Sequence, residues 1–80
     1  MDLKSRERVM LEGLKKLGFE YIARDEDGEI CAFEDEPIRT DDYGYNEWLG
    51  ENANFLDKDL FEFVSSESEE PTLIEDLLNN

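Results

Sequence analysis

The spacing of apolar residues changes from a helical to an extended pattern near residue 18. Within residues 2–17 the positions at helical spacing are Leu3, Met10, Leu14 and Leu17, and charged residues fill the opposite face. We therefore predict a helix over residues 2–17 with Asp2 as its N-cap. Gly18 suits the left-handed position just past the end, and Phe19 can fold back on Leu14 in a Schellman motif.

Residues 19–24 and 29–34 carry the next pattern, two short apolar runs on either side of an acidic turn that ends in Asp-Gly. This arrangement predicts two antiparallel strands around a three-residue hairpin loop ending at Gly28. The loop length places Tyr21 opposite Phe33 and Ala23 opposite Cys31, so apolar side chains meet on one face.

The middle of the chain has weaker patterns. Pro37 closes the second strand, a turn over residues 41–44 leads to a third strand over 45–49, and residues 50–54 form a loop. The next apolar residues fit neither period, and we expect a short helical turn followed by an extended piece; they are Leu56, Leu60, Phe61, Phe63 and Val64.

Residues 65–70 form a serine-acidic segment that we interpret as a flexible linker to a last helix. Pro71 fits the first turn of that helix, Thr72 and Glu75 resemble a capping box, and the apolar face comprises Leu73, Ile74, Leu77 and Leu78. We expect this tail to pack on its own domain, or else to dock on a partner or form the seam of a homodimer. The sequence predicts a single α+β domain over residues 1–80: an N-terminal helix on an antiparallel sheet of about three strands, and a short C-terminal helix.

Charge distinguishes this composition from that of an ordinary small domain. The chain has 23 acidic and 8 basic residues, a net charge of −15. Residues 1–16 hold five bases and three acids, so they carry +2 and the remaining 64 residues carry −17. Such a charge disfavours direct binding to nucleic acid or to an anionic membrane and favours basic partners or cations, although acidity also serves solubility alone.

Common catalytic and metal centres lack their residues here. The chain has one cysteine, Cys31, and no histidine, which excludes intramolecular disulfides, histidine bases and Cys/His zinc sites. Cys31 alternates inward with Phe33, as a small buried hydrophobe does. Paired carboxylates that suit acid/base chemistry occur at residues 34–36 and 41–42, but so short a chain can hardly build the required cleft. We expect no enzyme and no cofactor.

A calcium loop is the one metal site that the acidic turn suggests. With Gly28 as the loop glycine, however, the first ligand position falls on Ala23, and the flanks are strand-like where an EF-hand needs helices. A plain hairpin turn with no metal ligands is the better interpretation. No apolar segment is long enough for a membrane span or resembles a signal peptide, so we expect a cytoplasmic protein.

The candidate partner-binding segment combines carboxylates with aromatic residues, which anchor many protein interfaces. It comprises Asp35, Glu36, Asp41, Asp42, Tyr43, Tyr45, Glu47, Trp48 and Glu51. The competing interpretation is that Trp48 and one tyrosine complete the small core, and the pattern alone leaves both open.

Several short pieces of the chain resemble the small, mostly uncharacterised acidic proteins of phages and prophages of Gram-positive bacteria. The pieces are Gly18-Phe19, residues 22–25, Trp48, Leu60-Phe61 and residues 69–78. The resemblance implies an inhibitor or modulator of a host nucleic-acid-binding or defence protein, in some cases by imitation of DNA charge. The alternative is an accessory or structural phage protein that self-associates through its leucine-rich ends.

Overall fold

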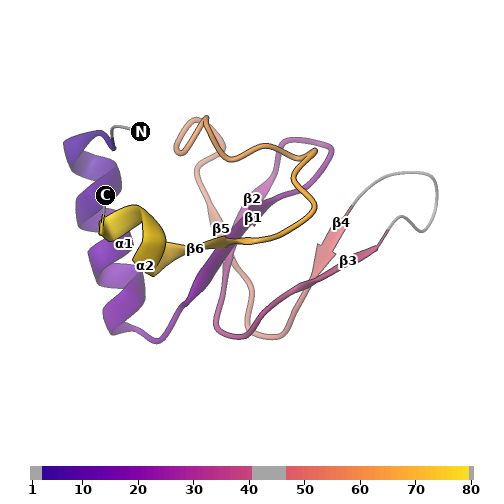
Figure 1. Ribbon diagram of the computed structural model, residues 1–80, viewed down its shortest axis with the longest axis horizontal. Helices are drawn as coiled ribbons and strands as arrows, with labels where there is room; N and C mark the ends of the chain where they lie inside the picture. Colours follow the sequence, from indigo (N-terminus) through magenta and orange to yellow (C-terminus); the bar gives the residue numbers. More distant parts are fainter. Residues whose placement is uncertain (1–2, 41–46, 80) are drawn as a thin grey trace.

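The structure is a computed structural model that describes residues 3–40 and 47–79 of the chain. Its elements are α1 (Ser5–Lys16), β1 (Tyr21–Arg24), β2 (Ile30–Phe33), β3 (Ile38–Thr40), β4 (Glu47–Leu49), β5 (Asn54–Leu56), β6 (Thr72–Leu73) and α2 (Ile74–Leu78). One antiparallel sheet has the strand order β5-β2-β1-β6, and β3 and β4 form a separate two-stranded sheet. The predicted α+β class is confirmed, and the helices lie at one end of the long axis with β3 and β4 at the other (Figure 1).

The two ends of α1 differ in how well the sequence predicted them. The helix begins at Ser5 with Lys4 as its N-cap, so the predicted cap at Asp2 is wrong. The Lys4 backbone N–H donates instead to the Glu7 carboxylate at 3.0 Å, which satisfies a free helix-end donor from inside the helix. The C-terminal Schellman motif is confirmed: Gly18 has φ +101°, and the Phe19 N–H donates to the Leu14 carbonyl at 3.0 Å.

The β1–β2 hairpin has the predicted register. Tyr21 lies opposite Phe33, and Ala23 lies opposite Cys31. The turn closes through the Asp25 N–H and the Glu29 carbonyl at 2.7 Å, with Gly28 at φ +95°. A glycine there avoids the strain that a side chain would cause at positive φ.

The strands that flank this hairpin come from segments predicted differently. Residues 54–56 form β5 beside β2, where we expected the end of a loop and a helical turn. The prediction of a helical turn followed by an extended piece is wrong, because the extended strand β5 comes first and turns follow it within residues 57–64. The predicted third strand exists as β4 but pairs with β3, which the sequence did not predict.

The C-terminal segment corrects a second prediction. Thr72 and Leu73 pair with β1 as strand β6, so α2 begins only at Ile74 and has no side-chain cap. The predicted capping box of Thr72 and Glu75 is wrong because sheet pairing uses the Thr72 backbone. The tail packs on its own domain, as expected: Ile74 and Leu77 are buried in the core between α1 and the main sheet.

The hairpin separates two apolar clusters. The large cluster lies on the face toward α1 and α2 and contains Leu11, Leu14, Ile22, Ile30, Ala32, Leu60, Phe61, Val64, Ile74 and Leu77. The small cluster lies on the opposite face and contains Ala23, Cys31, Phe33 and Trp48, with Tyr21 packed against it. All four residues of β2 are buried, because both faces of this strand are covered.

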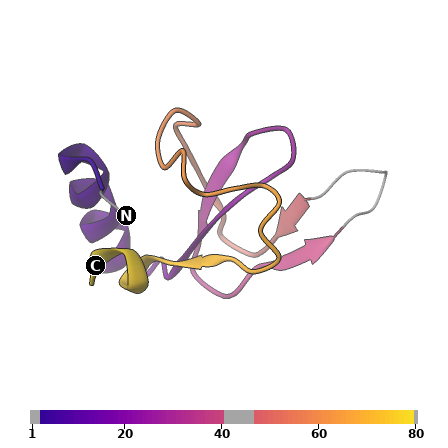
Figure 2. The ribbon, with the colours of Figure 1, turned by 45° about the horizontal axis from the view of Figure 1, so that its top comes forward.

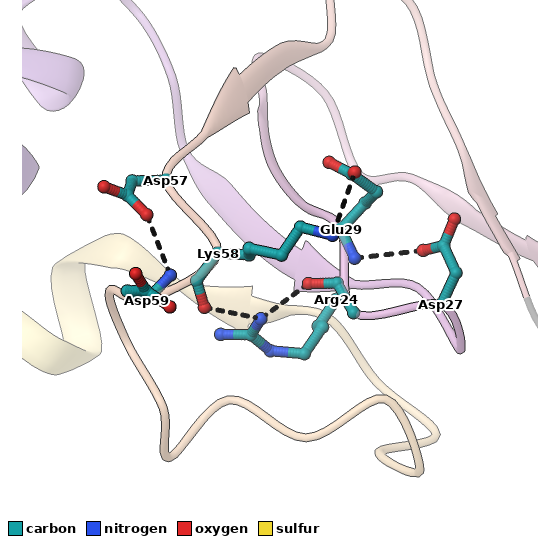
Figure 3. A network of polar contacts seen from close by, with 7 residues as sticks. Arg24, Asp27, Glu29, Asp57, Lys58 and Asp59 are labelled. Atoms are coloured by element: carbon teal, nitrogen blue, oxygen red, sulfur yellow. Dashed lines mark hydrogen bonds and ion pairs between the residues drawn. The ribbon is translucent and has the colours of Figure 1, made fainter.

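Two polar side chains fasten residues 57–64 to the large cluster. The Arg24 guanidinium donates to five backbone carbonyls, those of Gly28, Lys58, Leu60, Phe61 and Val64, at 2.7–3.2 Å. Figure 3 shows the bond to the Lys58 carbonyl. The buried Glu7 carboxylate accepts the Phe61 N–H at 2.6 Å, and Phe61 has φ +55°. Burial alone would raise the pKa of Glu7, but the N–H groups of Lys4 and Phe61 lower it overall.

Candidate functional site

The β3–β4 hairpin is held against the main sheet through Trp48. The Trp48 side chain is 5% exposed and packs in the small cluster. Its backbone N–H donates to the Asp25 carboxylate at 2.8 Å, which joins β4 to the β1–β2 turn. Beyond β4, the Gly50 backbone lies so close to the Phe33 ring that an added Cβ would come within 2.7 Å of Cδ1. The absence of a side chain at Gly50 therefore allows this approach.

Asp25 makes this hydrogen bond although its surroundings disfavour the charged form of its carboxyl. Burial raises the pKa of the Asp25 carboxyl, the Trp48 N–H opposes this, and the nearby charges of Asp27, Glu47 and Glu29 raise it further. The junction therefore combines a needed hydrogen bond with repulsion among carboxylates.

Arg39 fastens residues 66–68 to the β3–β4 sheet. Its guanidinium donates to the carbonyls of Ser66 and Ser68 and lies 5.7 Å from the centroid of the Trp48 ring. The segment that we interpret as a linker thus runs beside β3 before entering β6 (Figure 2). The sequence did not predict this contact.

A groove of about 370 Å³ lies between the β3–β4 sheet and the chain that enters β6. It is lined by Tyr21, Glu36, Pro37, Arg39, Trp48, Glu69, Glu70, Pro71 and Leu73. The carboxylates of Glu36, Glu69 and Glu70 outnumber the single cation of Arg39. We call this site the acidic groove; it combines aromatic and apolar walls with an anionic rim.

The structure brings together only part of the predicted partner-binding segment. Glu36 and Trp48 line the acidic groove. Asp35 and Glu51 are exposed outside its lining, and Glu47 is half-buried on β4. Asp41, Asp42, Tyr43 and Tyr45 lie outside the described residues.

Trp48 corrects the prediction of a free aromatic anchor. Because its side chain is buried, it completes the small cluster, and its place is a wall of the groove. This is the competing interpretation that the sequence left open. The tyrosine of that interpretation, Tyr43 or Tyr45, lies outside the described residues, and the tyrosine seen against the small cluster is Tyr21, from β1.

Sequence reasoning missed the second wall of the groove. Glu69, Glu70 and Pro71 were interpreted as linker and helix start, because no local pattern connects them with Glu36. The one sequence feature that could have indicated this wall is the register of the β1–β2 hairpin, which places Tyr21 on the face of the small cluster, opposite the helices. The pairing of Tyr21 with Leu73 in β6 then brings the preceding glutamates to that face.

The cations outside α1 contribute little to neutralising this surface. Arg24 and Arg39 donate to backbone carbonyls, and Lys58 pairs with Glu29 at 3.5 Å. Within α1 and its flank, Lys15 pairs with Glu20 at 2.5 Å. The two half-buried arginines thus direct their hydrogen bonds to the fold.

Other kinds of site find little support in the described residues. In residues 3–40 and 47–79 no cluster of three or more carboxylate or thiol groups is arranged to hold a metal ion. Burial, with the nearby Asp25 charge, raises the pKa of the Cys31 thiol to about 11, so at neutral pH it is not a thiolate nucleophile. The helices of this described part are too short or too polar to cross a membrane.

Comparisons with known proteins add no relative to this picture. No protein-family model, curated protein or solved structure matches the chain.

Proposed function

We propose that the chain is a non-enzymatic, phage-type inhibitor or modulator that binds a basic, nucleic-acid-binding or defence protein of the host. Its carboxylates take the place of nucleic-acid phosphates on that partner. It acts in the host cytoplasm without a cofactor and does not itself bind nucleic acid or membrane.

The observation that carries this proposal is how the chain uses its own cations. A protein that needed acidity only for solubility would gain stability by pairing arginines with carboxylates. Here the hydrogen bonds of Arg24 and Arg39 go to backbone carbonyls, so these arginines still count in the net charge but direct their donors to the fold. The excess of carboxylates over cations attracts a basic partner over long range and accelerates association.

The charge density supports mimicry of DNA. The residues that the structure describes have 20 acids and 8 bases, a net charge of −12, which over a long axis of 36 Å corresponds to one charge per about 3.0 Å. Duplex DNA carries one charge per about 1.7 Å of axis. The described part of the chain therefore has somewhat more than half of the duplex charge density, and the negative charge lies away from α1, because residues 1–16 carry +2.

Capture from host lysate followed by competition tests the proposal. We expect the immobilised chain to retain a DNA-binding protein, duplex DNA to displace it, and affinity to fall steeply with added salt. Uncharged polymer at equal mass should displace nothing. Retention of proteins that do not bind nucleic acid, or affinity independent of salt, would contradict mimicry.

Self-association is the second candidate, and one observation favours it. The cross-strand neighbours Ile38 and Leu49 are 73% and 51% exposed and form an apolar pair on the β3–β4 sheet. The leucine-rich ends of the chain are less available for self-association, because Leu14 and Leu77 are buried in the core. Sedimentation of wild type and of the variant I38S/L49S distinguishes the cases: a homodimer would dissociate in the variant.

A further inference from the structure

The walls of the acidic groove have the chemistry of a guanidinium site. Tyr21 and Leu73 are directly paired across β1 and β6, so their side chains emerge on the same face of the sheet. Tyr21 is half-buried and Leu73 is 37% exposed, which leaves aromatic and aliphatic surface for a side chain to cover. Pro71 extends this surface along the groove.

The chain already places one guanidinium at this site. Arg39 lies over the Trp48 ring and donates to the carbonyls of Ser66 and Ser68. An aromatic face with oxygen acceptors beside it is the environment in which guanidinium groups bind in proteins. The three glutamates of the rim come from two separate segments, Glu36 before β3 and Glu69 with Glu70 before β6.

We propose that the acidic groove receives an arginine side chain of the basic partner. The aliphatic stem of that arginine covers Leu73 and Pro71, and its guanidinium pairs with the carboxylates of the rim. Arginine suits the site better than lysine because its planar group stacks on aromatic rings and pairs bidentately with carboxylates. This inference rests on the proposed function and names the side chain that the partner contributes.

Trp48 supplies the measurement, since it is the only tryptophan of the chain and lines the groove. The probes are acetylated and amidated tetra-arginine and tetra-lysine peptides, titrated into the wild-type chain while Trp48 fluorescence is recorded. We expect the arginine peptide to change the fluorescence saturably and to bind about threefold or more tightly than the lysine peptide. Equal binding of both peptides would overturn the choice of arginine.

Two charge-matched triple variants separate the groove from net charge. E36Q/E69Q/E70Q removes the rim, and E12Q/E62Q/D76N removes three exposed carboxylates outside the groove lining. We expect the rim variant to lose about tenfold in affinity and the control to lose less than about threefold. Equal losses would show that general charge attracts the peptide and would overturn the site. Thermal melts confirm folding, which relief of self-repulsion should preserve.

The same variants distinguish this inference from the proposed function. If the protein captured from lysate binds the rim variant as tightly as wild type, the groove is not the contact, although mimicry by another acidic surface stands. If wild type captures no salt-sensitive basic protein, yet the arginine peptide still binds in the groove, the proposed function fails instead.

Discussion

The two faces of the β1–β2 hairpin are covered in different ways. The face toward the helices has ten buried apolar residues drawn from α1, α2, the hairpin and residues 60–64. The opposite face has four, and Trp48 of β4 is the largest of them. Polar contacts support both faces: Arg24 and Glu7 hold residues 57–64 on the large cluster, and Asp25 and Arg39 hold the β3–β4 sheet and residues 66–68 beside the small one. The two faces differ in apolar content, because the small cluster has fewer than half as many buried apolar residues. The acidic groove lies at the second, less deeply packed face.

Truncation of a buried leucine in the large cluster should have the largest effect. Leu11 is 0% exposed, so Leu11→Ala leaves a cavity in the core and should cost about 3 kcal/mol of unfolding free energy. Leu17→Ala is the matched control, because this leucine is 72% exposed, and it should change stability by less than about 0.5 kcal/mol. Urea unfolding measures both, and equal costs would refute the assignment of the core.

Arg24→Lys should rank second. Lysine supplies a compact ammonium in place of the five fork-shaped donors of arginine, so several of the carbonyls of residues 58–64 lose their partner. We expect a loss of about 2 kcal/mol. Hydrogen exchange should rise first at residues 57–64. A variant as stable as wild type would show that apolar packing alone holds this segment.

Gly50→Ala tests the close approach at the small cluster. The new Cβ would meet the Phe33 ring, which is 2% exposed and has little room to move, and we expect a loss of about 1 kcal/mol. Trp48 fluorescence should change as well, because β4 must shift. Gly13→Ala is the opposite case: nothing lies within 4 Å of the added Cβ, and alanine in α1 should stabilise by up to about 1 kcal/mol.

The smallest effects, at Asp25 and Glu7, should have opposite dependence on pH. The pKa of Asp25 is raised in the folded state, so its ionised form weakens folding above that pKa and this penalty disappears on acidification. Asp25→Asn keeps an oxygen for the Trp48 N–H, and we expect a modest gain in thermal midpoint at pH 7. This gain should shrink as pH falls through the raised pKa of the folded state and should be gone below the ordinary pKa of 3.8. A gain that persists unchanged into acid would exclude electrostatic relief.

Glu7 provides the comparison from the large cluster. Its pKa is lowered in the folded state, so its contribution is complete above the ordinary value of 4.5 and is lost as pH falls through the folded value. Glu7→Gln should therefore be less stable than wild type at pH 7, since the two N–H donors of Lys4 and Phe61 lose the carboxylate and only one of them can bond to the single amide oxygen. The difference in thermal midpoint between Glu7→Gln and wild type should narrow in acid, where the Glu7 carboxylate is protonated. Thermal melts at several pH values measure this difference, and a difference that stays constant would contradict the prediction.

The sequence by itself determined the elements whose causes are local. The Schellman end of α1 follows from Gly18, and the register of the β1–β2 hairpin follows from its loop length with Gly28 at positive φ. Each depends on residues within about six positions of one another, which a linear pattern contains. The acidity near the groove was visible in the same way, as a run of carboxylates around Glu36.

Only the tertiary structure decided what the remaining segments do. β5 and β6 became strands because β2 and β1 had free edges, although their own sequences predicted other structure. The burial of Trp48 and the meeting of Glu36 with Glu69 and Glu70 depend on contacts between segments far apart in the chain. The roles of Arg24 and Glu7 are equally nonlocal, because backbone carbonyls and N–H groups carry no residue signal.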